Sequence, residues 1–246
     1  MDALYQNKKL VEVYDAINRS REDFDFYIAE LPEPPAALLD IGCGTGTFAP
    51  ALADRGYQVT AVDPATQMVA MASRKDTERS VNWVTGSVAD LAIDLRVDAA
   101  VMTGHAFQCL LEDSAISGLF EEVANRLSRN GSFWFETRNR AAKPWLRWRP
   151  DCAAPPFDLG GARTVEVTHN VLSVNEDYVT FEEQYSFSDD SEVLTSRSTL
   201  RFLDIDEIDD LAVRNCLTVS EAFGNWKREA LMSDSPEIIV RLQKAV

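Results

Sequence analysis

Residues 38–46 read LLDIGCGTG, an apolar run followed at once by three glycines within five positions. The apolar run predicts a buried strand over residues 37–41. Glycine loses more conformational freedom on folding than any other residue, so three glycines in one turn carry a cost in free energy that an ordinary turn avoids. A bare loop between a strand and a helix lets the main chain approach a ligand, while the helix N-terminus offers free N–H groups. The stretch therefore predicts a strand–loop–helix unit that binds a cofactor.

Strand and helix patterns alternate on both sides of this loop. Short apolar runs predict strands over residues 37–41, 58–63, 81–86, 97–102 and 132–137. Helical spacing predicts helices over 48–56, 66–75 and 114–131, the last with one apolar stripe and Gly131 as its C-terminal stop. Strands that alternate with helices through short connections form a parallel sheet covered on both faces, so the fold class is α/β.

The two ends of the chain have other patterns. The first thirty residues predict helix, which Pro32, Pro34 and Pro35 end, and residues 1–35 therefore predict a helical cap. Beyond residue 140, apolar and polar residues alternate with period two, which predicts an antiparallel β meander with one solvated face. Asp204 then caps a predicted helix, followed by strands over 217–224 and 237–244. We expect one domain over 1–246, with residues 145–203 inserted as a β lid after the fifth strand.

Composition limits the partners and the compartment. The formal net charge of −16 disfavours nucleic acid and an anionic membrane surface, and favours a small molecule. The N-terminus lacks the apolar stretch of a signal peptide, so we expect a cytoplasmic protein, monomeric or homodimeric, with reduced thiols. Only two histidines are present, and no spacing indicates a metal site. The cysteines form no CxxC pair and are Cys43, Cys109, Cys152 and Cys216.

The whole stretch LLDIGCGTG resembles motif I of class I S-adenosylmethionine-dependent methyltransferases. Later stretches resemble the family's following motifs in order: VTAVDPATQMV (59–69), VTGSVADL (84–91), VDAAVMTGHAFQCL (97–110) and LSRNGSFWFETRN (127–139). Residues 145–148 (WLRW), the meander and the terminal SPEIIV (235–240) are similar to the small-molecule branch, such as bacterial aminosugar N-methyltransferases. The resemblance implies a Rossmann-like fold with a mostly parallel seven-stranded sheet, and in-line transfer of a methyl group from S-adenosylmethionine to a small-molecule acceptor, without a metal.

The resemblance also implies a cofactor site. Asp63, at the end of the second strand, is expected to accept hydrogen bonds from both ribose hydroxyls. The third motif departs from the family, because Ser87 stands where an aspartate often contacts adenine; either Ser87 or Asp90 takes that place. Arg19 and Arg21 lie on a segment that often covers the cofactor, and a guanidinium there would hold the methionine carboxylate. The full expected set is Tyr14, Arg21, Gly42, Cys43, Gly44, Gly46, Asp63, Pro64, Met68, Ser87, Val88, Met102 and Thr103.

The acceptor side follows the fourth and fifth strands. His105 lies at the carboxyl end of a strand, where open α/β sheets place their ligand crevices, and would be a general base or a hydrogen-bond partner of the substrate. A helix-capping or structural role for this histidine is the alternative. His169 is expected on the surface. The residues expected to line the acceptor pocket are Phe107, Arg138, Trp145, Trp148 and Tyr185.

Two other functions compete with this interpretation. Gly44, Gly46 and Ala49 satisfy the G-x-G-x-x-G/A pattern of dinucleotide binding, which predicts an NAD-dependent oxidoreductase. The motif context and the later motifs argue against it. A protein that binds S-adenosylmethionine without catalysis, as a regulator, is the third possibility.

Overall fold

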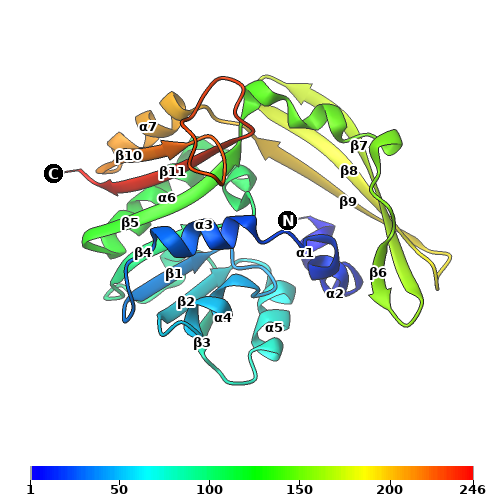
Figure 1. Cartoon of the computed structure of the whole chain (residues 1–246), viewed down its shortest axis with the longest axis horizontal. Helices are drawn as coiled ribbons and strands as arrows, with labels where there is room; N and C mark the ends of the chain where they lie inside the picture. Colours follow the sequence, from blue (N-terminus) through cyan, green and yellow to red (C-terminus); the bar gives the residue numbers. More distant parts are fainter. Residues whose placement is uncertain (1, 246) are drawn as a thin grey trace.

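The computed structural model describes residues 2–245, which form two β-sheets. The larger sheet has seven strands in the order β10-β11-β5-β4-β1-β2-β3 (Figure 1). These strands are β1 (Ala37–Ile41), β2 (Gln58–Asp63), β3 (Val81–Thr85), β4 (Val97–Met102), β5 (Leu127–Arg138), β10 (Leu217–Phe223) and β11 (Glu237–Lys244). Strands β1 to β5 pair in parallel, and β11 runs antiparallel to both β5 and β10. This is the expected Rossmann-like, mostly parallel sheet of the class I methyltransferase fold.

In the described part of the chain, seven α-helices connect or flank these strands. They are α1 (Ala3–Gln6), α2 (Lys8–Ile17), α3 (Glu22–Glu30), α4 (Phe48–Ala53), α5 (Thr66–Lys75), α6 (Asp113–Arg126) and α7 (Ile205–Arg214). Short 3-10 turns are η1 (Val88–Asp90), η2 (Ala106–Cys109), η3 (Arg140–Ala142), η4 (Pro144–Arg147) and η5 (Pro150–Cys152). None of these helices is long and apolar enough to cross a membrane.

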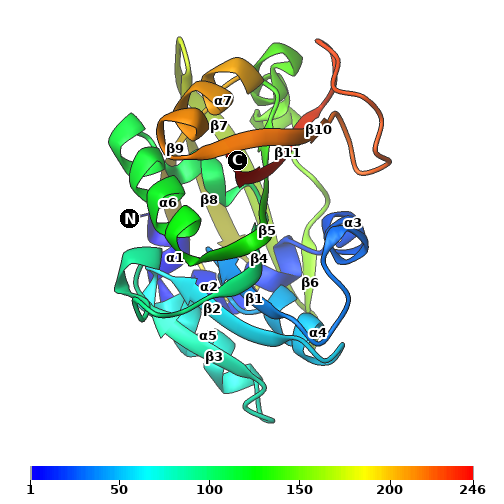
Figure 2. The same cartoon turned by 90° about the vertical axis from the view of Figure 1, so that its left-hand side faces the viewer.

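Both faces of the larger sheet are buried, as the apolar strand sequences predict. Neighbouring residues of one strand point into different cores: Leu38 packs among side chains of α3 and α4, and Leu39 among side chains of α6 and α7. Figure 2 shows α6 and α3 on opposite sides of the sheet. The carboxyl ends of β1, β2 and β4 are thereby fixed side by side at one edge.

The second sheet is the predicted antiparallel meander. Its order is β6-β7-β8-β9, with β6 (Phe157–Gly160), β7 (Arg163–Asn175), β8 (Tyr178–Phe187) and β9 (Val193–Arg201). In Figure 1 it arches over α1 and α2, which lie between it and the larger sheet. Leu10 and Val13 of α2 share an apolar cluster with Val165, Val167 and other residues of the meander. The N-terminal helices are therefore held between the two sheets.

Two sequence expectations need correction. The N-terminal helical segment is divided at Asn7, whose side chain accepts a hydrogen bond from Lys9 N and starts α2, and again before α3. Helix α6 ends at Arg126 and β5 begins at Leu127, so Gly131 is a strand residue and no helix stop. The reason is a bulge: Val97 pairs with Leu127 but Ala99 pairs with Ser132, and the intervening β5 residues bend out of register. His169 lies at the surface of the meander, as expected, with a side chain that is 34% exposed and pairs with Glu183 at 3.0 Å.

Candidate functional site

A cavity of about 1190 Å³ lies at the carboxyl ends of β1, β2 and β4. The glycine loop forms one wall and the N-terminal helices another, and residues of the segment after β3, of η2, α6, β5 and β9, together with Trp226, line the remainder. Sites for one small molecule usually measure roughly 300–1,000 Å³. This cavity therefore has room for a cofactor together with an acceptor.

The glycine loop presents bare main chain to this cavity. Gly42, Gly44 and Gly46 all have positive φ, at +69°, +55° and +73°. A Cβ at Gly44, or at Gly104 on the facing loop, would meet no heavy atom within 4 Å, so both backbones are open to the cavity. Gly46 is different, because a Cβ there would lie 2.6 Å from Ala72 and from Trp83. Gly46 therefore serves helix packing, and it does not line the cavity.

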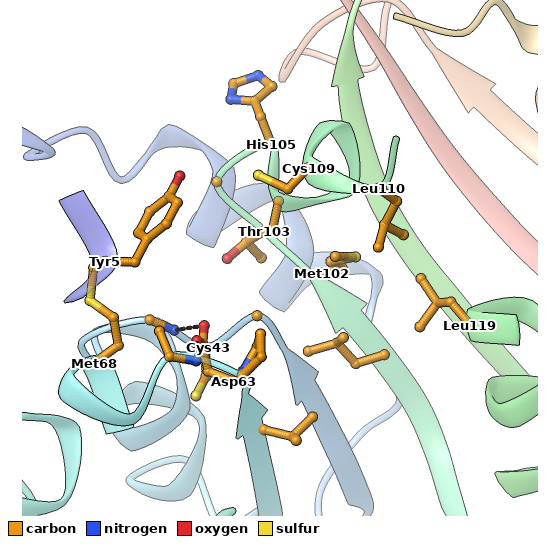
Figure 3. Close-up of a pocket in the computed structure, with 18 of the residues that line it drawn as sticks. Tyr5, Cys43, Asp63, Met68, Met102, Thr103, His105, Cys109, Leu110 and Leu119 are labelled. Atoms are coloured by element: carbon orange, nitrogen blue, oxygen red, sulfur yellow. Dashed lines mark hydrogen bonds between the residues drawn. The ribbon is translucent and has the colours of Figure 1, made fainter. Parts of the chain in front are cut away.

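Asp63 lies beside this loop at the end of β2. Its Oδ2 accepts a hydrogen bond from Gly44 N at 3.0 Å, and its Oδ1 accepts one from Ala65 N at 2.7 Å. Figure 3 shows Asp63 next to Cys43 and facing the space below Thr103. Burial raises the pKa of Asp63, and the two backbone N–H groups oppose that rise. Each oxygen has a further lone pair, which suits a carboxylate that accepts bonds from a vicinal diol.

Asp40 is a second buried carboxylate of this region. It lies in β1, is 1% exposed, and neither of its oxygens has a hydrogen-bond partner among the described residues. Burial, followed by the nearby charge of Asp63, raises its pKa to about 7. The folded chain therefore holds the proton of Asp40 more tightly than the unfolded chain does. The stability that results is fully present below about pH 4 and is lost as the pH rises through 7.

We expect Asp40→Asn, which imitates the neutral acid, to reduce the pH dependence of stability. Between pH 5 and pH 8 the free energy of unfolding of the wild type should fall by about 2–3 kcal/mol more than that of the variant. For a chain of this size that difference corresponds to about 4–12 °C in the melting temperature. Thermal unfolding of both proteins at the two pH values, with exposed Asp94→Asn as control, measures it. Parallel pH profiles of Asp40→Asn and wild type would contradict the assignment.

The region expected to hold adenine contains the predicted third-motif residues. Ser87 and Val88 line the cavity, and Met68 and Met102 lie at opposite sides of it (Figure 3). Asp90 does not line the cavity; its carboxylate accepts bonds from Ser87 N and Ser87 Oγ, both at 2.8 Å, and caps η1. Of the two alternatives for the adenine contact, the structure therefore brings Ser87 to the cavity.

The N-terminal helices close the cavity opposite the loop. Tyr14 and Arg21 line it, and Arg21 Nη1 donates to the carbonyls of Asn18 and Ser20 at 2.8 and 2.6 Å. Arg19 donates to Asp158 O at 2.7 Å and lies outside the lining. Asp15 fastens α2 to the core, because it bonds to Thr45 of the glycine loop and pairs with Lys75 of α5.

His105 stands at the far end of the cavity from the glycine loop (Figure 3). It has a left-handed backbone, φ +59°, and its backbone N–H donates to Glu136 Oε1 at 2.7 Å. Its Nε2 lies 2.9 Å from Glu237 Oε2. A carboxylate on Nε2 favours the tautomer with the proton there, which leaves Nδ1 as an acceptor.

Four of the expected acceptor residues do not line the cavity, and these expectations need correction. Phe107 is 2% exposed, and its ring stacks on that of Phe135 with a centroid distance of 4.3 Å. The left-handed turn at Gly104 and His105 directs Phe107 into the core under α6. Trp145 and Trp148 pack against Phe202 and Phe181, and Tyr185 is buried under α2, bonded to Glu183 at 2.9 Å. Of the expected acceptor set, only Arg138 faces the cavity in the described chain.

The cavity also contains residues that the sequence interpretation missed. They come from every wall and include Asp2, Tyr5, Phe24, Cys109, Leu110, Leu119, Glu136, Arg197, Thr199 and Trp226. Glu136 carried a usable signal, since it is a charged residue inside the otherwise apolar run SFWFET. Its side chain is fully buried, accepts a hydrogen bond from Tyr27, and has a pKa that burial raises. No group of side chains among residues 2–245 has the make-up of a metal site.

The chain is similar to methyltransferases in sequence. Residues 38–131 match the family described as "Methyltransferase domain". A cypemycin N-terminal methyltransferase of Streptomyces sp is 28% identical over 171 residues, which cover 68% of this chain and 69% of that protein. The chain spans about half the length of a ubiquinone biosynthesis O-methyltransferase of Xanthomonas campestris, at 40% identity over 118 residues.

Solved structures agree over almost the whole length. An S-adenosylmethionine-dependent methyltransferase from Clostridium acetobutylicum has a TM-score of 0.78 at 16% identity, covering 97% of this chain and 98% of that one. The S-adenosylmethionine-bound CalS10, an amino pentose methyltransferase from Micromonospora echinaspora, has a TM-score of 0.70 at 18% identity and covers 94% of each chain. At these identities the likeness establishes the fold alone.

Proposed function

We propose that the chain is a class I S-adenosylmethionine-dependent methyltransferase and that it methylates the amine nitrogen of a small molecule; the matched methyltransferase domain, the related sequences and the shared fold support this. The observation that carries the proposal is the single continuous cavity, which begins at the glycine loop and Asp63 and extends to His105 and Arg138. Its volume suits a cofactor and an acceptor held together, which is what in-line transfer requires.

The residues at the loop end fit the cofactor. The open backbones at Gly44 and Gly104 give room for close contact, and Asp63 has the acceptor capacity for a ribose. Tyr14 and Arg21 would cover the methionine part, and Ser87, Val88 and Met68 would surround adenine. Bound S-adenosylmethionine supplies a methyl group on a sulfonium, which leaves as a neutral thioether.

The charge of the cavity favours an amine as acceptor. Asp15 and Glu122 pair with Lys75 and Arg126, which lie outside the lining, and the other carboxylates of the lining still outnumber its guanidinium groups, an excess that attracts a cation. Among residues 2–245 the charged lining groups are Asp2, Asp15, Asp23, Asp63, Glu121, Glu122 and Glu136 against Arg21, Arg138 and Arg197. The names of the cypemycin N-terminal methyltransferase and the amino pentose methyltransferase also point to nitrogen acceptors in related proteins. An amine that arrives protonated must lose its proton before it attacks. His105 Nδ1 is the group we assign to accept that proton, with Glu237 orienting the ring.

Cofactor class is the first test. Thermal shift and calorimetry with S-adenosylmethionine, S-adenosylhomocysteine and NAD should show binding of the two adenosyl ligands only. Stabilisation by NAD alone would support the oxidoreductase alternative and overturn the proposal. Methyl transfer from radiolabelled cofactor to a panel of amines and matched alcohols then tests catalysis. Cofactor binding with no transfer to any amine would favour a non-catalytic binding protein.

For His105→Ala we expect a loss of kcat of about 10- to 100-fold at pH 7, which is below the usual contribution of a general base because solvent also removes amine protons. The loss should shrink as the pH approaches the pKa of the acceptor amine, since the acceptor then arrives neutral. The measurement is the pH profile of kcat with an amine from the panel. His169→Ala, on the second sheet, is the matched control and should keep the wild-type profile. Full turnover of His105→Ala across neutral pH would exclude this residue as the base.

A further inference from the structure

Arg138 is an unpaired cation in the wall of the cavity. It ends β5, and no carboxylate of the described residues forms an ion pair with it. Among residues 2–245, its single side-chain acceptor is Gln108 Oε1, at 2.9 Å from Nη1. A guanidinium carries five N–H donors in a planar fork, so most of this fork is unused by the protein. An unused fork on a cavity wall is a ready binding group for an anion.

The surroundings of Arg138 fix its orientation. Gln108 is fully buried and its amide donates to Arg201 O at 3.2 Å, so its oxygen is held toward the guanidinium. The ring of Trp148 lies beneath the guanidinium carbon at 5.7 Å. Burial is the main cause that lowers the pKa of Arg138, and the carboxylates of Glu237 and Glu136 oppose it from a distance. A desolvated and oriented fork of this kind is more selective than a flexible surface arginine.

We propose that Arg138 binds a carboxylate of the acceptor, so that the substrate is an amine that also carries a carboxylate. This rests on the proposed function, and it narrows the acceptor from any amine to an amino-acid-like or peptide-like zwitterion. One guanidinium balances one carboxylate. A phosphate dianion fits less well, because the unpaired carboxylates of the same lining repel a second negative charge. The alternative ligand of Arg138 is the carboxylate of the cofactor itself, so the test must distinguish an acceptor carboxylate from the cofactor carboxylate.

The probe is trifluoroacetate. Fluorine NMR measures its affinity for protein that is saturated with S-adenosylhomocysteine. We expect Arg138→Met to weaken trifluoroacetate binding by about tenfold or more while the affinity for S-adenosylhomocysteine stays within about twofold of wild type. Gln108→Glu leaves Arg138 in place but pairs it with an internal carboxylate, and should weaken the probe in the same way. Arg147→Met, on an exposed position of the neighbouring η4 turn, is the matched control and should bind as wild type does.

Each other outcome overturns the proposal in a distinguishable way. Equal binding of trifluoroacetate to wild type and Arg138→Met would show that Arg138 is not the anion site. A loss of S-adenosylhomocysteine affinity in Arg138→Met would assign the residue to the cofactor. If inorganic phosphate displaces trifluoroacetate at a lower concentration than acetate does, the ligand of Arg138 would be a phosphate and not a carboxylate. Failure of wild type to bind S-adenosylhomocysteine at all would refute the proposed function and not this inference alone.

The activity panel gives an independent readout. With the dipeptide Ala-Ala and its C-terminal amide as matched acceptors, we expect transfer to the free acid to exceed transfer to the amide by about tenfold in kcat/KM. The preference should disappear in Arg138→Met through a rise in KM for the acid, with kcat little changed. Equal use of acid and amide by the wild type would contradict a carboxylate-bearing acceptor.

Discussion

Asp63→Ala should bind S-adenosylhomocysteine about 100- to 10,000-fold more weakly than the wild type. The proposed role gives this carboxylate two hydrogen bonds to the ribose, and bonds to a charged group contribute about 1.5–3 kcal/mol each. The substitution also removes the acceptor of Gly44 N and Ala65 N, so the glycine loop loses the side chain that holds it against β2. Both effects lower cofactor affinity, and isothermal titration calorimetry well below the melting temperature measures their sum.

The control for this prediction separates binding from folding. Asp94→Ala removes an exposed carboxylate and should leave both affinity and stability unchanged. The apo form of Asp63→Ala should still unfold cooperatively, because the surrounding core of β1, β2 and β4 is apolar and unaltered. An affinity of Asp63→Ala within about threefold of wild type, with the fold intact, would show that the ribose is held elsewhere.

Local signals were sufficient for the sheet and for the loop end of the cavity. The apolar strands, the glycines and Asp63 act through main-chain geometry and burial, which sequence spacing reports directly. The alternation at period two also predicted the meander, because one of its faces is solvated. Boundaries failed where an irregularity intervened, as at the β5 bulge that places Gly131 inside a strand.

The acceptor end could not be predicted in the same way, because it depends on long-range packing. Trp145 and Trp148 are followed by the meander in sequence, and their rings pack against Phe181 of that second sheet and against Phe202, which directly follows β9. Tyr5 reaches the cavity because the meander on one side and α5 on the other hold α1 and α2 over it. No pattern within the N-terminal segment encodes that placement, since the contacts that produce it come from distant parts of the chain, such as Met68 of α5 and Ser196 of β9.

The glycines at 44 and 46 should respond in opposite ways to the same substitution. Gly46→Ala places a Cβ 2.6 Å from Ala72 and Trp83 and forces a left-handed alanine. Left-handed backbone costs about 1–2 kcal/mol and overpacking about 1–3 kcal/mol, so we expect a loss of about 2–5 kcal/mol in the free energy of unfolding. For this chain length that is a fall of about 4–20 °C in the melting temperature, measured by thermal unfolding of the apo protein.

Gly44→Ala should instead keep most of the stability and lose the cofactor. Its Cβ meets nothing within 4 Å, so only the left-handed backbone costs free energy, about 1–2 kcal/mol. That Cβ projects into the cavity, where it occupies space that a ligand against the loop needs, and affinity for S-adenosylhomocysteine should fall about 10- to 100-fold.

Gly161→Ala separates the two contributions. Gly161 has a comparable φ, +60°, with nothing within 4 Å of a Cβ, but it lies in the turn between β6 and β7, away from the cavity. It should match Gly44→Ala in stability and match wild type in affinity. If Gly44→Ala also bound S-adenosylhomocysteine as wild type does, the ligand would not lie against the loop, and the bare main chain at residues 42–46 would need another explanation.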